Sequence, residues 1–298
     1  MNAEERHEYT TFPSRKTTFT LFAEDMGDGW LQLLNLIMHC GTVKSTRKGE
    51  RLTEVLNAIV TIKLAAEEEL PACFDIGTEK LEVYYKRSFP ISSVQGVRQL
   101  DRTIERLQGS HDTKRGTMVL LGPTDLDKMA KAPCVVLITF NIVDERLYGT
   151  YVLRSDDTYN MWPFDALSLT RLQREVSKQV GVAVDSATFI SHSAHIYERD
   201  WGKARAKLDK WFKRPLPLQP DPSGLFFFGV ENGRTRALFV DSEANTVLWE
   251  GESADPEDLV RYIVDTMPWL TAQHIRYLGQ EAAKLTLALT QGVPYEQG

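Results

Sequence analysis

The strongest structural signal in the chain is the run APCVVLITFNIVDERLYGTYVLRSDD, residues 132–157. Residues 135–143 and 147–153 are rich in β-branched and aromatic side chains, and a short polar turn separates them. Two such runs joined by a short turn predict a β-hairpin. Because the two ends of a hairpin meet at one edge of a sheet, we expect Cys134, just before the first strand, to lie beside Arg154, just after the second.

Helical and strand patterns alternate on the N-terminal side of this hairpin. From residue 29 onward, apolar residues recur at helical spacing and stop at Gly41, a typical residue at a helix end. Residues 97–107 carry apolar side chains on one face and arginines on another, which predicts an amphipathic helix. Residues 1–27 are polar and are interpreted as an arm or an edge strand. Strands are predicted at residues 52–62, 81–85 and 117–121.

On the C-terminal side, residues 166–180 predict a helix that ends at Gly181. Residues 187–190 predict a buried strand, and residues 203–212 predict a further helix. The proline-rich residues 214–222 interrupt regular structure, so we expect a domain boundary there.

The remaining residues predict a small α+β domain over residues 221–298. Asn232 and Gly233 suit a tight hairpin turn between two of its strands. We therefore expect an N-terminal arm over residues 1–28 and a large α+β domain over residues 29–217 before it. The elements predicted in the small domain are strands at residues 225–230, 236–240 and 246–250 and helices at residues 256–266 and 271–292.

Composition and charge exclude several classes of protein. Hydrophobic residues make up 42% and charged residues 26%, so a disordered chain is excluded. The formal net charge of −6 offers no global basic surface, so we do not expect nucleic acid as a partner. No apolar run approaches the roughly 20 residues that span a bilayer, and the polar N-terminus lacks a secretory pattern. We expect a cytoplasmic protein with no membrane segment.

The three cysteines, Cys40, Cys73 and Cys134, are an odd number without metal-type spacing. This pattern argues against a disulfide framework and against a zinc site. We expect free thiols and no metal.

Four short motifs stand at the ends of the predicted elements. They are Pro133-Cys134, Arg154-Ser155-Asp156-Asp157, Pro163-Phe164-Asp165 and His195-Ile196-Tyr197. Further matches lie upstream in residues 44–49, in Lys114-Arg115 and in residues 126–130. Their order and spacing resemble the thymidylate synthase family, which includes the pyrimidine hydroxymethylases. The resemblance covers about residues 29–217.

The resemblance implies a thymidylate synthase-like mixed β-sheet with packed helices, in a homodimer. It also implies that the Cys134 thiolate adds to C6 of a pyrimidine nucleoside monophosphate, which makes C5 a carbon nucleophile. C5 then attacks the methylene group of 5,10-methylene-tetrahydrofolate or of a methanopterin-type analogue. Tyr84 matches a tyrosine that assists proton removal from C5. A nearby cation such as Arg154 favours the thiolate.

Binding roles follow from the same resemblance. His195 and Tyr197 are expected to bond the sugar hydroxyl, and Asp157 is expected to bind the pterin. Taken alone, the basic turn around Arg47 is more often a solvated loop, and Asp156-Asp157 could be a solvated turn. The residues implied to hold the phosphate are Arg47, Arg154 and Ser155, with Lys114 and Arg115 from the other subunit.

The sequence departs from the family pattern in several places. Val135 replaces a histidine, Leu153 a glutamine and Met161 a glycine. The segment that carries the family's catalytic glutamate is shortened, and an extra domain replaces the C-terminal tail. The candidates for the glutamate are Glu67, Glu68 and Glu69.

Asp165 stands where the uracil-reading members of the family carry asparagine. The asparagine amide can accept from N3–H of uracil and donate to O4. Cytosine reverses this pattern, because its N3 accepts and its amino group donates, so a carboxyl is the complementary partner. The same exchange marks the cytidylate hydroxymethylases, in which water captures the methylene intermediate. We therefore expect Asp165 to be a catalytic, base-reading residue, with CMP or dCMP as substrate and a 5-hydroxymethyl product.

Alternatives remain open at this point. Asp165 could cap the N-terminus of the helix predicted at residues 166–180. The chain could keep the Cys134 chemistry and act as a thymidylate synthase or a dUMP hydroxymethylase. It could also be a non-catalytic nucleotide-binding protein, which the departures at Val135 and Leu153 would suit.

The C-terminal residues resemble an uncharacterised small domain fused to pterin-related proteins of archaea and cyanobacteria. The match rests on residues 272–279 and 295–297. It implies a link to a modified one-carbon carrier or a role in stabilising a dimer, and a plain packing module is the alternative.

Overall fold

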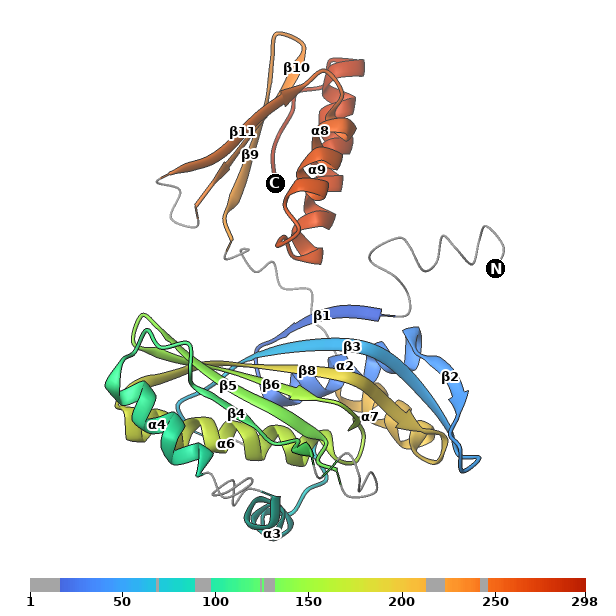
Figure 1. Ribbon diagram of the computed structural model, residues 1–298. Coiled ribbons are helices and arrows are strands. Elements are labelled where there is room, and N and C mark those ends of the chain that lie inside the picture. Colours follow the sequence, from blue (N-terminus) through green and yellow to red (C-terminus); the bar gives the residue numbers. More distant parts are fainter. Residues whose placement is uncertain are drawn as a thin grey trace. The chain divides into compact units, whose positions relative to one another are not determined.

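The computed structural model describes residues 17–67, 70–88, 98–123, 125, 132–212, 223–241 and 246–298 (Figure 1). The chain divides into two compact units, Met1–Arg214 and Pro215–Gly298. The first contains a mixed sheet with packed helices, and the second contains a small antiparallel sheet with helices. The predicted α+β class is therefore confirmed.

Among the described residues, the sheet of the first unit has eight strands in the order β1-β3-β8-β6-β5-β4, with β2 beside β3 and β7 beside β8. The β1–β3, β6–β8 and β7–β8 pairs are parallel, and the others are antiparallel. The predicted hairpin is confirmed, because β5 pairs antiparallel with β6 and Val135 lies opposite Leu153. The strands are β1 Thr17–Ala23, β2 Thr42–Ser45, β3 Arg51–Lys63, β4 Thr117–Val119, β5 Val135–Val143, β6 Arg146–Leu153, β7 Asp156–Asp157 and β8 Ala183–Tyr197.

Helices α4 and α6 lie on one face of this sheet (Figure 1). α6 has Pro163 in its first turn, where the missing N–H has no helical partner to lose. It ends at Gly181, whose φ of 86° is a conformation that favours glycine. The helices are α2 Met26–Cys40, α3 Thr78–Ser88, α4 Gln99–Gly109, α6 Trp162–Val180 and α7 Trp201–Trp211, with a 3₁₀ turn at Glu198–Asp200.

A buried glutamine fixes α6 on the sheet. Gln173 donates from Nε2 to the Leu147 carbonyl at 2.8 Å and to the Ser186 carbonyl at 3.0 Å. The Tyr151 hydroxyl lies 2.8 Å from Oε1 of the same side chain. Gly149 leaves room for it, since a Cβ there would lie 2.5 Å from that oxygen. Gln173 therefore joins α6 to β6 and β8 at once.

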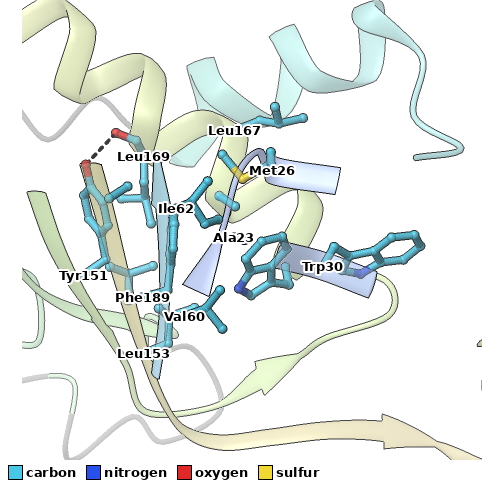
Figure 2. Packing of buried hydrophobic residues seen from close by; sticks show 14 of the residues in the cluster. Ala23, Met26, Trp30, Val60, Ile62, Tyr151, Leu153, Leu167, Leu169 and Phe189 are labelled. Carbon is cyan, nitrogen blue, oxygen red and sulfur yellow. Dashed lines mark hydrogen bonds between the residues drawn. The ribbon is translucent and has the colours of Figure 1, made fainter. Parts of the chain in front are cut away.

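Apolar side chains fill the space between α2, α6 and the sheet, as Figure 2 shows. Tyr151 stacks on Phe189 with ring centroids 5.1 Å apart, and Trp162 lies 5.4 Å from the same ring. The Trp30 indole of α2 donates to the Thr158 carbonyl at 2.8 Å. This packing fixes the start of α6 and the turn that precedes it.

One predicted strand is wrong, because residues 81–85 belong to α3. The Tyr84 hydroxyl donates to Asp165 and the Tyr85 hydroxyl to Glu175, and both acceptors lie on α6. Adjacent tyrosines suit a strand by composition, but contact with α6 outweighs that preference.

Two further elements differ from their predicted extents. β8 continues past the predicted residues 187–190, so His195 and Tyr197 lie within a strand and not after it. At the N-terminus, Thr17–Ala23 is the edge strand β1, and residues 1–16 lie outside the described residues.

The second unit is built on an antiparallel sheet in the order β11-β10-β9. Asn232 and Gly233 form the predicted turn between β9 and β10, with φ values of 52° and 72°. Phe226 and Phe239 stack in its core with centroids 4.5 Å apart. In both units, no helix among the described residues is long and apolar enough to cross a membrane. The elements are β9 Leu225–Glu231, β10 Arg234–Val240, β11 Val247–Ser253, α8 Pro256–Thr266 and α9 Ala272–Gln291.

Candidate active site

The end of the β5–β6 hairpin places Cys134 beside Arg154. The Arg154 backbone N–H donates to the Cys134 carbonyl at 2.9 Å. Its guanidinium turns back on the same loop and donates from Nε to the Pro133 carbonyl at 2.9 Å and from Nη2 to the Ala132 carbonyl at 2.8 Å. The predicted proximity is confirmed, and Arg154 braces the loop that carries the thiol.

The charges around Cys134 oppose one another. Although the residue is exposed, desolvation by neighbouring atoms raises the pKa of its thiol, and the Asp165 carboxylate raises it further. Arg154 lowers this pKa, while Asp156 and Asp157 raise it. Because the net shift is upward, Arg154 alone does not favour the thiolate enough to outweigh the other groups.

Asp165 lies in the first turn of α6 and is 5% exposed. The Tyr84 hydroxyl donates to its Oδ1 at 2.5 Å. Burial raises the pKa of Asp165 to about 6, and the Tyr84 hydrogen bond opposes that shift. The helix-cap alternative is wrong, because Met161 occupies the cap position and the Asp165 N–H already donates to the Met161 carbonyl at 3.0 Å.

β7 carries the two aspartates that end the Arg-Ser motif. Asp157 pairs with His195 in the register of β7 and β8. Asp156 is 1% exposed, so the solvated-turn alternative is wrong for this residue. Burial raises the pKa of Asp156 to about 8, and a hydrogen bond from the Ser191 hydroxyl opposes that shift.

Asp157 is half-buried and is held by a residue that the sequence did not single out. Asn160 Nδ2 lies 3.2 Å from both carboxylate oxygens of Asp157 and donates to Asp200 Oδ2 at 2.9 Å. Asn160 thus ties the turn after β7 to the start of α7. The available signal was an asparagine three residues after an aspartate in a turn, a spacing at which such side chains bond locally.

His195 and Tyr197 lie two residues apart on β8, so their side chains share a face. Their ring centroids are 5.1 Å apart. Desolvation lowers the pKa of His195, whose Nδ1 lies 3.2 Å from the Ser193 carbonyl. Arg199 lies over the Tyr197 ring at 4.3 Å. The neutral imidazole of His195 and the phenol of Tyr197 can each donate a hydrogen bond to a ligand hydroxyl or accept one from it.

The cations expected to bind phosphate within the chain are Arg47 and Arg154. Arg47 is exposed in the turn between β2 and β3, and Leu52 at the start of β3 pairs with Tyr197. Ser155 is half-buried directly after Arg154. Arg47 therefore lies toward the Tyr197 end of the sheet.

Lys114 and Arg115 are exposed and lie toward the opposite end of β5 from Cys134. β4 runs antiparallel to β5, with Thr117 opposite Thr139. The two cations precede Thr117, whereas Cys134 precedes the other end of β5. The fold does not bring them to the thiol of the same chain, and their supply from a second subunit stays a prediction.

The candidates for the catalytic glutamate and the motif at residues 126–130 stay predictions. Glu67 is exposed. Glu68, Glu69 and the motif at residues 126–130 lie outside the described residues. Within the described part of the chain, no group of three or more His, Cys, Asp or Glu side chains could hold a metal ion.

Comparison with known proteins gives a matching family model for each of the two units. The thymidylate synthase family model matches residues 75–221, and the PterinBD-DUF4346 model matches residues 220–298. A relative from Methanothermobacter thermautotrophicus, named "Putative thymidylate synthase", is 32% identical over 221 residues, which is 65% of this chain and 99% of the relative. Relatives of the same name from Methanothermobacter marburgensis and Methanococcoides burtonii are 31% and 30% identical, over 63% and 61% of this chain and 96% and 90% of their own lengths. The chain belongs to the thymidylate synthase family.

Proposed function

We propose that this protein transfers a one-carbon unit from a methylene-tetrahydropterin to C5 of CMP or dCMP and forms a 5-hydroxymethyl product. The observation that carries the proposal is the buried Asp165 carboxyl, which accepts from the half-buried Tyr84 hydroxyl and raises the pKa of the Cys134 thiol more than the other charged groups do. By resemblance to the family, Asp165 is the residue that would read the base edge.

The Asp165 carboxyl is suited to cytosine. Its Oδ1 accepts from Tyr84, which leaves Oδ2 for a ligand. With a pKa of about 6 it can exchange a proton near neutral pH, so it can accept from the cytosine amino group or donate to N3. Opposite uracil it would face O4 as a second acceptor. A buried acceptor left unpaired costs about 1–3 kcal/mol.

The chain's own groups supply the nucleophile and the proton transfers. The Cys134 thiolate adds to C6, so that the C5=C6 electron pair forms a C4=C5 bond and the C4=N3 pair moves to N3. Asp165 supplies the proton that N3 takes up. C5 would then bond to the methylene carbon that a bound pterin supplies, Tyr84 would assist removal of the C5 proton, and the bond from that carbon to the pterin nitrogen would break with its electron pair going to the nitrogen. Addition of water to the methylene carbon and departure of Cys134 restore the C5=C6 bond.

A hydrogen-bond acceptor that suits a pterin carrier lies beside this site. The half-buried Asp157 carboxylate is an acceptor for the amino and ring N–H groups of a pterin, and its contacts to Asn160 Nδ2 are long at 3.2 Å. Asp157 would hold the pterin, which supplies the methylene carbon when bound. The family name matched by the second unit also points to pterin binding, and we propose that this unit serves the same carrier.

The test is release of tritium from C5 of CMP, dCMP and dUMP, with methylene-tetrahydrofolate and with a methanopterin-type carrier. We expect release from a cytidine nucleotide and none with Cys134→Ser. The Asp165→Asn variant should shift the preference toward dUMP on the order of 10- to 100-fold, because an amide complements uracil. Release from dUMP alone, unaltered by Asp165→Asn, would contradict the proposal.

A second candidate function is thymidylate synthesis from dUMP, which the name carried by the archaeal relatives favours. The same assay separates the two, because a synthase would release tritium from dUMP and oxidise its carrier. A change in carrier absorbance that accompanies release identifies hydride transfer.

A further inference from the structure

Asp156 is a buried carboxyl that the mechanism above does not use. Its Oδ2 accepts from the Ser191 hydroxyl at 2.8 Å. Its Oδ1 accepts no hydrogen bond from any residue in the described part of the chain, although the side chain is 1% exposed. A buried carboxylate ordinarily gains a cation or several donors, whereas the hydroxyls of Ser191 and Thr158, which oppose the rise in the pKa of Asp156, are both neutral.

The surroundings of Asp156 are mostly acidic. Asp165 from α6 and the adjacent Asp157 both raise its pKa, and Asp156 in turn raises the pKa of the Cys134 thiol. The charged groups that act on Asp156 or on the Cys134 thiol are Asp157 on β7, Asp165 on α6 and Arg154 at the end of the β5–β6 hairpin. His195 and Tyr197 on β8 lie at the same end of the sheet, with Glu54 and Lys44 acting on His195 and Arg199 on Tyr197. Arg154 is the cation that lowers the pKa of the thiol, and its guanidinium donates to two loop carbonyls.

This arrangement favours the neutral carboxylic acid. The Ser191 hydroxyl donates to Oδ2 and stabilises the charge in part, but desolvation by burial outweighs this hydrogen bond. In the ionised form the charge would sit in a desolvated site beside two other carboxyls, which is unfavourable.

We infer that Asp156 is a positioning residue for the Cys134 nucleophile: as a neutral acid it permits the thiolate to form, and when it ionises it suppresses the thiolate. The inference rests on the proposed role of Cys134 and adds a proton switch to it. The pKa of Asp156, raised to about 8, agrees with a neutral acid in the resting enzyme. As pH rises through about 8, Asp156 gains a negative charge, and that charge raises the pKa of the thiol.

The experiment measures the rate at which iodoacetamide alkylates Cys134 in the full chain without substrate, from about pH 6 to pH 10. Mass spectrometry of the peptides separates Cys134 from Cys40 and Cys73. In Asp156→Asn the charge cannot form, so we expect half-maximal alkylation about one pH unit below that of the wild type. Ser191→Ala removes the donor that favours the ionised carboxyl, so its curve should move part of the way in the same direction.

The matched control is Asp144→Asn, the same exchange at an exposed residue in the turn at the other end of the β5–β6 hairpin, and it should leave the curve in place. Coincident curves for the wild type, Asp156→Asn and Ser191→Ala would overturn the inference, as would a change of equal size at every pH. If Asp156→Asn does not fold, Ser191→Ala alone decides. If the alkylation curves shift but no tritium is released, the proposed function fails and this inference stands. If tritium is released but the curves coincide, this inference fails and the proposed function stands.

Discussion

Asp165 is buried, its hydrogen-bond donor in the described part of the chain is the neutral Tyr84 hydroxyl, and this placement reduces stability. A carboxylate that is 5% exposed, with one phenol donor, prefers to be protonated, so its pKa rises to about 6. Groups held in such an unfavourable state are common where a protein binds or reacts with a ligand. The position therefore supports a functional role for Asp165 over a purely structural one.

We predict that Asp165→Asn stabilises the protein in a pH-dependent way. The folded-state pKa lies above the unfolded value near 4, so the wild type loses stability as pH rises from about 4 to about 6. Asparagine keeps an acceptor for Tyr84 but does not titrate. Above about pH 6 the variant should be more stable by about 3 kcal/mol, and near pH 4 the difference should vanish. Urea unfolding at several pH values measures it, and a gain independent of pH would contradict this origin.

Among the elements, α6 matters most because it carries Asp165 and packs against β6 and β8. Gln173 fixes it through the Leu147 and Ser186 carbonyls, and it is fully buried. A side chain that bonds two strands from one helix restricts movement of that helix along the sheet. The Gln173 side chain therefore also helps to fix the position of Asp165 relative to the sheet.

We predict that Gln173→Leu lowers the free energy of unfolding on the order of 3 kcal/mol, because the Leu147 and Ser186 carbonyls lose their buried donor and the Tyr151 hydroxyl keeps one of its two acceptors, the Leu169 carbonyl. The matched control is Gln108→Leu, since the exposed Gln108 also donates to a carbonyl, that of Gln179, at 2.7 Å. That variant should lose less than about 1 kcal/mol. Equal losses of unfolding free energy in the two variants would show that burial of the Gln173 side chain does not add to its contribution.

At the scale of the molecule, the position of Lys114 and Arg115 bears on the predicted homodimer. Both cations lie away from the end of β5 that carries Cys134. A homodimer in which each chain supplies them to its partner's site would reconcile their position with a phosphate-binding role.

We predict complementation between two inactive variants, Cys134→Ser and Arg115→Ala. In a mixed dimer one site would contain Cys134 from one chain and Arg115 from the other. Random mixing should restore about a quarter of wild-type tritium release, since half of the dimers are mixed and half of their sites are intact. No recovery after confirmed subunit exchange would place Arg115 in the site of its own chain or outside it.

Much of the fold could be predicted from local patterns. The hairpin that brings Cys134 to Arg154 follows from two β-rich runs and a short turn, and the end of α6 follows from Gly181. The pattern predicts this helix from residue 166, whereas α6 begins at Trp162. Residues 81–85 could not be assigned in this way, because two adjacent tyrosines suit a strand as well as a helix. Their contacts with α6 are between residues far apart in the sequence.

The amino-acid sequence alone identified the order of the motifs, the cysteine, the aspartate at position 165 and the class of fold, because these depend on residue type and short-range spacing. It could not identify Asp156 as a buried acid or Asn160 as the partner of Asp157 and Asp200. Whether a carboxyl is solvated, paired or buried depends on which strands and helices surround it. That environment exists only once β7 has paired with β8 and α6 has packed beside them.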